Sequence, residues 1–465
     1  AKSMSGVLQV MQIEEAVAVL ADGFWQAKQA LAQVDITYTQ PEEASIQQAD
    51  IFTQFGQAME AAIADGEQEE DVKQGKVEKG FSSAAKVVDA EYQVPYLAHA
   101  CMEPLNCTVW LHDGICEIWT GTQNPLGVKD EIAEFLGYDT DQVLVHNQYL
   151  GGGFGRRAET DVARQAVAIA QQVDHPVQLI WTREEAMRQD VYREANVSRF
   201  RAALDEAGKP FAWENQYVDK HHPPDAPHIP YGIANQFIHY VKSPTHIPWG
   251  NWRSVDHSLH GFFTESFIDE LAVEAQQDPY EYRRELLKDQ PRFLKVLDMA
   301  AEKGNWGKPL PENWGRGIAI HKSFFTIVAE VVEVEIVGDK PKVHKVTCVA
   351  DPGYAYHPDG FKAQMESGIM YGLSAALHGE ITIENGAVKQ SNFHDYEILR
   401  MDEAPQVETF IINSGHKAGG AGEPSTPAIA PAVANAIFDA NGQRVRSLPI
   451  KLEANPLKTE FGVGG

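Results

Sequence analysis

The sharpest candidate for chemistry is a carboxylate that follows four small residues and precedes a helix start. It lies in the run Gly419-Gly420-Ala421-Gly422-Glu423-Pro424, in a region with few other charges. A carboxylate in such surroundings suits the role of a general base. The alternative is an acid at a helix N-terminus that the helix dipole stabilises, and the local sequence alone favours this alternative.

A second candidate is the glycine-rich run Gly151-Gly152-Gly153-Phe154-Gly155-Arg156-Arg157. It stands between a strand-like segment and a helix, so its backbone N–H groups could receive an anion at the helix N-terminus. The pattern matches neither the dinucleotide-binding fingerprint nor a P-loop. A tight structural turn explains the glycines equally well.

Three further segments bring polar groups that suit a bound ligand. Gln123 and Asn124 follow the strand-like stretch 116–120, Arg253 precedes an aromatic-rich helix, and Gln364 lies on a helix after Asp359-Gly360. Amides and a guanidinium can bind an anionic, oxygen-rich group. The simpler alternatives are turn residues, a surface ion pair and a solvated helix residue.

The hydrophobic pattern predicts the elements that must position these residues. Strands are expected over 6–13, 16–20, 35–38, 143–150, 177–181, 318–325, 328–336 and 343–349, with a hairpin over 381–390 around Asn385-Gly386. Helices are expected over 24–34, 160–173, 259–275 and 361–377. Ser425 or Thr426 can cap a last helix that has Pro427 in its first turn and Gly442 after its end.

The chain of 465 residues should form about three packing units. Residues 1–40 are predicted to be half of a small α/β domain, and the acidic, Gln-rich residues 41–86 a solvated linker. Two larger mixed α/β units, 87–305 and 306–465, are expected to enclose a cleft. The chain begins at Ala1, which indicates a cut end.

Composition narrows the class of function. The net charge of −27 disfavours nucleic acids and anionic membrane surfaces. No stretch approaches the roughly 18 apolar residues of a spanning helix, so no transmembrane segment is expected. Four cysteines without a C-x-x-C pair do not suit a disulfide scaffold or an iron–sulfur cluster held by this chain. The H-E-x-x-H and G-x-S-x-G motifs are absent, which disfavours a zinc hydrolase and an acyl-transfer hydrolase.

Taken in order and spacing, seven passages resemble the molybdenum-binding large subunit of the xanthine dehydrogenase and aldehyde oxidase family, most closely the isoquinoline 1-oxidoreductase beta-subunit type. They run from about residue 7 to residue 450. The passages are Ala16 to Asp22, His99 to Pro104, Thr120 to Pro125, Gly151 to Arg157, Gly250 to Val255, Gln364 to Glu366 and Gly420 to Pro424.

The resemblance implies an α+β (mixed α/β) fold. Residues 1–40 would be the C-terminal half of a hammerhead domain, followed by two large molybdopterin-binding domains around a cleft. It also implies a molybdopterin cytosine dinucleotide carrying molybdenum with oxo and sulfido groups. The implied reaction hydroxylates an aldehyde or an N-heteroaromatic carbon with oxygen from water.

The resemblance further assigns roles to single residues. Glu423 corresponds to the general base, and Gln123 to the amide that hydrogen-bonds the oxo group. Residues implied in cofactor binding are Gly152, Gly153, Phe154, Gly155, Arg253, Gln364, Gly420, Ala421 and Gly422. No side chain of this sequence is expected to ligate the metal.

Departures from the family pattern also make predictions. Arg156, Arg157 and Ala158 replace the Gly-Lys-Glu of the xanthine-oxidising branch, so a purine substrate is not expected. Asp351-Pro352-Gly353 replaces the more usual Asp-Cys-Gly. The family's Gly-Gln-Gly cofactor loop and the first half of the hammerhead domain are missing, so an N-terminal fragment or separate chain is expected to complete the site.

The resemblance implies further partners: a small subunit with 2Fe-2S clusters that removes electrons, with cytochrome c as a further acceptor. It implies a periplasmic location, and a cytoplasmic enzyme encoded by a split gene is the alternative. A non-catalytic scaffold or assembly subunit with an empty cleft is the alternative function. A hydrolase or lyase that uses an acid pair has no motif in its favour.

Overall fold

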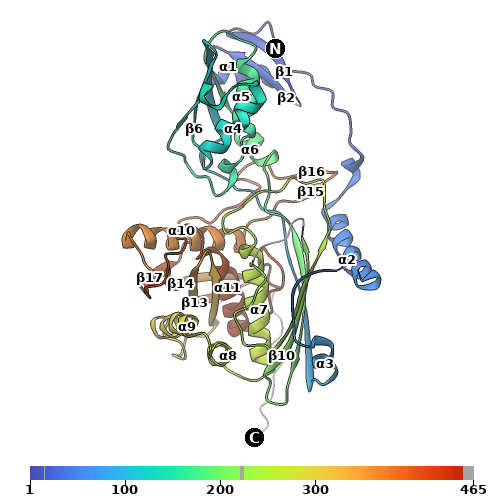
Figure 1. Ribbon diagram of the computed structural model, residues 1–465, viewed down its shortest axis with the longest axis vertical. Helices are drawn as coiled ribbons and strands as arrows, with labels where there is room; N and C mark the ends of the chain where they lie inside the picture. Colours follow the sequence, from blue (N-terminus) through green and yellow to red (C-terminus); the bar gives the residue numbers. More distant parts are fainter. Residues whose placement is uncertain (15, 67, 220–224, 454–465) are drawn as a thin grey trace.

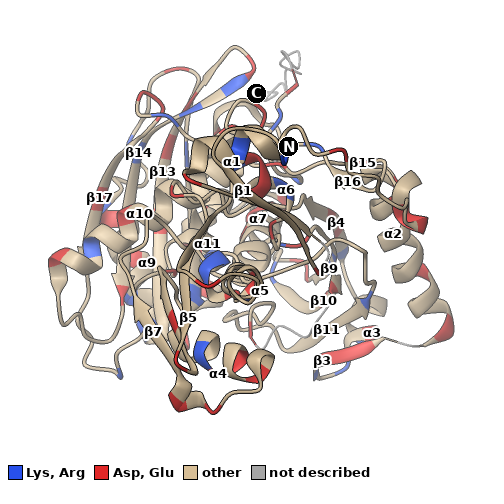
Figure 2. Ribbon diagram, turned by 90° about the horizontal axis from the view of Figure 1, so that it is seen from above, with Lys and Arg blue, Asp and Glu red and all other residues tan. Residues whose placement is uncertain are grey.

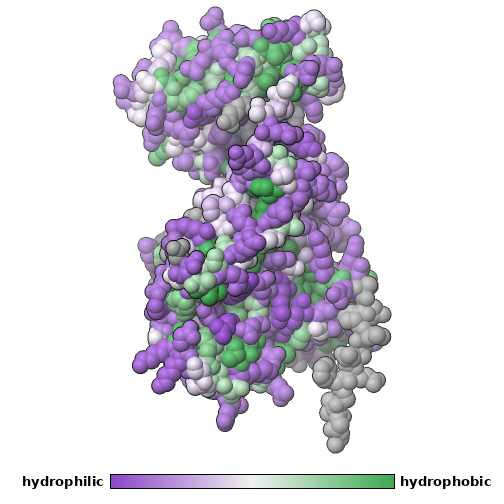
Figure 3. Space-filling view, turned by 90° about the vertical axis from the view of Figure 1, so that its right-hand side faces the viewer, coloured by the Kyte–Doolittle hydropathy of each residue, from purple (hydrophilic) through white to green (hydrophobic). Residues whose placement is uncertain are grey.

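Two lobes joined through a narrow waist make up the molecule (Figures 1 and 3). The computed structural model describes residues 1–14, 16–66, 68–219 and 225–453. The upper lobe of Figure 1 holds the N-terminal hairpin and one four-stranded sheet, and the lower lobe holds the five-stranded sheet, a second four-stranded sheet and the longest helices. Within the described ranges, no helix combines the length and apolar character that crossing a membrane requires.

The upper lobe is built on a four-stranded sheet of order β7-β6-β5-β8, in which only β6 and β7 run parallel. Its elements are β1 (Val7–Ile13), β2 (Ala16–Ala21), α1 (Phe24–Leu31), β5 (Asn106–His112), β6 (Ile115–Thr120), α4 (Pro125–Leu136), β7 (Val143–Asn147), α5 (Asp161–Ala170), β8 (Val177–Ile180) and α6 (Arg183–Arg188). Met11 and Ile13 of β1 join the buried core of this sheet. The N-terminal hairpin therefore depends on this sheet for its burial.

The lower lobe begins with a five-stranded sheet of order β3-β11-β10-β9-β4, in which only β10 and β11 run parallel. Its elements are α2 (Gln48–Asp65), β3 (Glu69–Gln74), α3 (Val77–Ser82), β4 (Lys86–Val94), β9 (Asn196–Leu204), β10 (Pro210–Asp219), β11 (Asn235–Lys242), α7 (His257–Glu274), α8 (Pro279–Leu286) and α9 (Pro291–Lys303). Every residue of α7 from His257 to Ala272 is buried. The prediction of one apolar face on this helix is therefore incomplete, because the protein surrounds the helix on all sides.

A second sheet of the lower lobe has the order β12-β13-β14-β17. Its elements and neighbours are β12 (Trp314–Ser323), β13 (Thr326–Val337), β14 (Lys340–Asp351), α10 (Pro358–Leu377), β15 (Ile383–Glu384), β16 (Ala387–Val388), β17 (Gln406–Ile411) and α11 (Thr426–Asn441). Helix α11 packs closely on β12, because a Cβ on Gly317 would lie 2.1 Å from the Ala432 carbonyl oxygen. One apolar core contains residues of both sheets, α7, α10 and α11. The ranges 87–305 and 306–465 thus contribute to one core, and residues 454–465 lie outside the described part of the chain.

The prediction of a solvated linker over 41–86 is wrong, because this range forms α2, β3 and α3. Ile51, Phe55 and Met59 of α2 are buried in a cluster with Tyr96. Strand β3 pairs with β11, which lies more than 150 residues further along the chain. The strand expected over 35–38 is also absent: the described residues there form no strand. For residues 41–86 the outcome depends on distant partners that local composition does not reveal.

Several local predictions are confirmed. Helix α11 has Pro427 in its first turn and ends at Gly442, whose φ of 78° is the left-handed conformation. Asn385 and Gly386 both have positive φ between β15 and β16, as a two-residue hairpin turn requires. Ser425 occupies the cap position, but its hydroxyl donates to the Met365 carbonyl 2.9 Å away instead of capping the helix.

Candidate active site

Gln123 and the glycine-rich turn lie together at the edge of the upper lobe. The Gly155 N–H donates to Gln123 Oε1 over 3.1 Å. The two hydrogens on Nε2 of this amide have no acceptor among the described residues, so they remain available to a ligand. A Cβ on Gly153 would lie 2.4 Å from Gln123 Oε1. Any side chain at position 153 would collide with Gln123, so glycine is required there even without a ligand.

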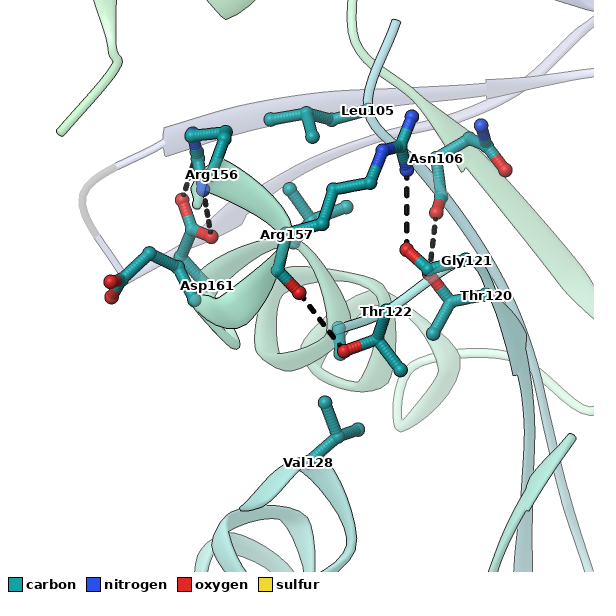
Figure 4. Close-up of a pocket in the computed structure, with 12 residues that line it drawn as sticks. Leu105, Asn106, Thr120, Gly121, Thr122, Val128, Arg156, Arg157 and Asp161 are labelled. Carbon is teal, nitrogen blue, oxygen red and sulfur yellow. Dashed lines mark hydrogen bonds and ion pairs between the residues drawn. The ribbon is translucent and has the colours of Figure 1, made fainter. Parts of the chain in front are cut away.

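The two arginines that follow the turn are directed into the protein (Figure 4). Arg157 is 3% exposed and donates to the carbonyl oxygens of Gly152 at 2.9 Å and Gly121 at 3.3 Å. Arg156 makes a bidentate pair with Asp161 at 2.9 and 2.7 Å. The Arg157 guanidinium therefore supports the backbone around the turn, whereas the Arg156 guanidinium is occupied by a carboxylate.

Arg253 connects three segments of the lower lobe. It is 6% exposed; Nε donates to the Gly422 carbonyl over 2.7 Å, and Nη2 donates to the Gln364 carbonyl over 3.2 Å. Nη1 donates to Ser367 Oγ on α10 over 2.9 Å. Burial lowers the pKa of Arg253, while Tyr371 and Glu423 act in the opposite direction. The predicted residues Arg253, Gln364 and Gly422 are thus in direct contact.

Glu423 is anchored beside this cluster by Ser254. The Ser254 N–H donates to Glu423 Oε1 over 3.1 Å, and the Ser254 hydroxyl donates to the Glu423 carbonyl over 2.6 Å. The second carboxylate oxygen, Oε2, has no donor among the described residues, so one oxygen is fixed while the other can accept a proton. Sequence reasoning did not give Ser254 this role, and no local pattern indicates it.

Three stacked rings join the glycine turn to the Arg253 segment. Phe154 stacks on Tyr371 of α10 with centroids 4.4 Å apart, and Tyr371 stacks on Trp252 at 4.6 Å. Sequence reasoning missed Tyr371. A signal was present, because Tyr371 lies seven residues after Gln364, on the same face of α10.

Backbone strain is concentrated in the same segments. Positive φ angles at residues other than Gly, Asn and Asp are uncommon, and they occur here at Ala100 (50°), Phe154 (54°), Ser254 (77°), Val255 (44°), Phe324 (50°) and Phe325 (65°). The Gly420 N–H donates to the Phe324 carbonyl over 2.8 Å, which places the Phe324–Phe325 pair against the loop that carries Glu423. Such strain typically clusters at functional sites.

The open hydrogen-bond donors of these segments fit an anionic, oxygen-rich group. Within the described residues, the N–H groups of Gly152, Gly153 and Phe154 have no acceptor, nor do those of Ala421, Gly422 and Glu423. A Cβ on Gly422 would meet only Gln364 Oε1, 3.9 Å away, so the space beside this residue is open. Many of the acidic residues lie on peripheral elements such as α2, α4 and β3 (Figure 2). The segments around Glu423 contain the positively charged Arg253.

Comparison with known proteins agrees with this geometry. Two families, each described as a molybdopterin cofactor-binding domain, match residues 60–287 and 293–405. The beta subunit of isoquinoline 1-oxidoreductase from Brevundimonas diminuta is 28% identical over 97% of this chain and 62% of the relative. A membrane-bound aldehyde dehydrogenase [pyrroloquinoline-quinone] from Gluconacetobacter polyoxogenes is 30% identical over 81% of this chain and 54% of the relative.

Among solved structures, quinoline 2-oxidoreductase from Pseudomonas putida 86 superposes with a TM-score of 0.78. The alignment covers 96% of this chain and 90% of the other at 14% identity, so it bears on the fold alone. It confirms the mixed α/β architecture. The chain spans 62% and 54% of the two curated relatives named above. The chain belongs to the xanthine dehydrogenase and aldehyde oxidase family of molybdopterin-binding oxidoreductases.

Proposed function

We propose that the chain is the molybdopterin-binding part of an oxidoreductase that hydroxylates an aldehyde or an N-heteroaromatic carbon with oxygen from water. The observation that carries the proposal is the half-anchored carboxylate of Glu423, held by Ser254 next to the Arg253 cluster. When bound, the molybdopterin group would supply the two-electron redox chemistry. The printed names of the curated relatives, an isoquinoline oxidoreductase and an aldehyde dehydrogenase, support the substrate classes.

The chain's own residues would position the reactants and move one proton. Ser254 N–H orients the carboxylate through Oε1, so that Oε2 of Glu423 can remove the proton of the attacking hydroxyl group. The free Nε2 hydrogens of Gln123 would donate to an oxygen of the bound group. The open N–H groups of the glycine turn and of residues 421–423 would bind its remaining oxygens.

The substrate would lie against the Phe324–Phe325 turn. Phe325 is 63% exposed, and the neighbouring Phe324 packs against the loop that carries Glu423. An exposed aromatic ring next to the turn that contacts the Gly420 loop suits a flat heterocycle or an aromatic aldehyde. The inward direction of Arg157 and the absence of a carboxylate at Ala158 oppose a purine substrate.

The proposal includes partners and a compartment. The cytosine dinucleotide form of the cofactor, a small 2Fe-2S subunit, cytochrome c as electron acceptor and the periplasm all follow from the family resemblance. A further polypeptide would complete the cofactor site. The designation of one relative as a beta subunit supports an assembly of several subunits.

The test is Glu423→Gln in the assembled, cofactor-loaded protein, with molybdenum and pterin quantified in every sample. We expect full cofactor content with turnover lowered about 10²- to 10⁴-fold, because the amide cannot accept the proton. Glu134→Gln on the exposed face of α4 is the matched control and should turn over normally. Normal turnover of a loaded Glu423→Gln protein would refute the assigned base. A wild-type assembly without pterin or molybdenum would favour the non-catalytic scaffold.

A further inference from the structure

The ring of His99 is buried between two groups that can only accept hydrogen bonds. His99 lies between β4 and β5 and is 1% exposed. Its Nδ1 lies 3.0 and 3.2 Å from the two carboxylate oxygens of Asp190, and its Nε2 lies 3.0 Å from the carbonyl oxygen of Asn251. When Asp190 is ionised, both ring nitrogens must carry a hydrogen to satisfy these acceptors, and this arrangement suits an imidazolium.

A protonated His99 would offset one of the negative charges around the ring. Asp190 accepts the N–H groups of His99 at 2.7 Å and Val191 at 2.9 Å, as an ionised carboxylate does, and pairs with Arg156 Nε at 3.0 Å. Arg156 in turn pairs with Asp161. A charged His99 makes this group of four neutral. A neutral His99 would leave one uncompensated negative charge in a largely buried network, which is costly.

His99 fixes the backbone that presses on the glycine turn. A Cβ on Gly155 would lie 1.4 Å from the Asn251 carbonyl oxygen and 3.2 Å from His99 Nε2, and Gly155 has φ of 110°. The Nε2–H of His99 therefore holds the one oxygen against which the turn closes. The His99 carbonyl also accepts a hydrogen bond from the Tyr371 hydroxyl at 2.9 Å. Phe154 of the turn stacks on the Tyr371 ring.

We propose that His99 is a positioning residue of the cofactor site, and that its doubly protonated ring keeps the glycine turn in register with the segment Asn251 to Arg253. The inference rests on the proposed function, because a molybdopterin is the ligand that these two segments would share. Loss of one proton would leave either the Asn251 carbonyl or the Asp190 carboxylate without its donor. The turn and the Arg253 segment would then separate, and the cofactor would be released.

Several charged and polar groups lie around His99. Those on the surrounding elements are Asp190, Arg156, Glu159, Cys101 and the hydroxyl of Tyr371. Burial raises the pKa of the Cys101 thiol to about 11, so this neighbour is neutral at pH 7. The Asp190 carboxylate is the charged acceptor that lies nearest to Nδ1 of the ring.

The first measurement is nitrogen NMR of the full chain labelled with ¹⁵N-histidine, at pH values from 6 to 9. The chain has 17 histidines, and the signals lost in His99→Gln identify the ring. We expect imidazolium shifts for both nitrogens at pH 7 in the wild-type protein. A neutral tautomer at pH 7 would overturn the proposal. If His99→Gln does not fold, Asp190→Asn identifies the ring instead, because it should convert the signals to those of a neutral imidazole at pH 7.

The second measurement is the pterin retained by the assembled protein after gel filtration, over the same pH range. We expect the wild-type protein to lose pterin with the same pH midpoint as the His99 titration. His99→Gln should bind about ten- to a hundredfold more weakly at pH 7, since its amide can donate to Asn251 but then turns an oxygen toward Asp190. The control is His146→Gln, on β7 beside Glu117, which should retain pterin as the wild type does.

The outcomes separate this inference from the proposed function. A wild-type assembly that carries no pterin at any pH refutes the proposed function and with it the positioning role. A wild-type assembly that carries pterin, together with a folded His99→Gln protein that retains it equally well, refutes the role of His99 alone. Pterin loss at a pH unrelated to the His99 titration likewise refutes the role of the second proton.

Discussion

Glu330 is a buried acid that the proposed chemistry does not use, and its removal gives a quantitative test of the structure. The side chain is fully buried on β13, and neither carboxylate oxygen has a hydrogen-bond partner. Its cross-strand neighbours are Ala319 on β12 and Cys348 on β14, and neither supplies a charge. Burial therefore raises the pKa of the Glu330 carboxyl well above its usual value of 4.5.

The sign of the pH effect follows from this shift. Above pH 4.5 the carboxyl is ionised in the unfolded chain, while the folded protein must keep it protonated, so the folded state binds more protons and loses stability as the pH rises. Glu330→Gln is neutral in both states and does not have this penalty. Between pH 5.5 and 6.5 the stability advantage of Glu330→Gln should grow by about 1.3 kcal/mol, the value for one proton over one pH unit.

The assay is urea unfolding followed by tryptophan fluorescence, at half-unit steps from pH 5 to pH 7.5. The midpoint of Glu330→Gln relative to that of the wild type should rise steadily from pH 5 upward. Glu312→Gln, which changes an exposed carboxyl before β12, is the matched control and should follow the wild type at every pH. Parallel curves for wild type and Glu330→Gln would show that Glu330 is hydrated or paired, and would refute the reasoning.

Three further substitutions test the packing of the site. Gly155→Ala should destabilise the protein by about 3 kcal/mol or more or prevent its folding, because the new Cβ would lie 1.4 Å from the Asn251 oxygen; soluble yield and thermal midpoint measure this. Gly422→Ala should leave the thermal midpoint unchanged but reduce bound pterin, because its Cβ would point into open space. Arg253→Lys should lower the free energy of unfolding by about 2 kcal/mol and reduce the pterin content. The reason is that an ammonium group cannot replace the guanidinium, which binds Gly422 and two groups on α10. An unchanged thermal midpoint and pterin content would contradict this.

The sequence alone determined those features whose causes are local. Helix α11 could be predicted with its Pro427 start and Gly442 end, and so could the Asn385-Gly386 hairpin, because the required backbone angles depend on the residues themselves. The strands β12, β13 and β14 followed from dense runs of β-branched residues. The family could also be identified from the sequence, because seven motifs in fixed order need no tertiary structure to be compared.

The tertiary structure decided what depends on partners distant in the chain. Residues 41–86 have the composition of a linker, yet β3 finds its partner in β11 and α2 finds a cover near Tyr96. The sequence left Glu423 open between a helix-capping acid and a base. Its half-anchored carboxylate appears only when Ser254, 169 residues earlier, is brought beside it. The same holds for the two hydrogen-bond partners of His99, because Asp190 and Asn251 lie 91 and 152 residues further along the chain.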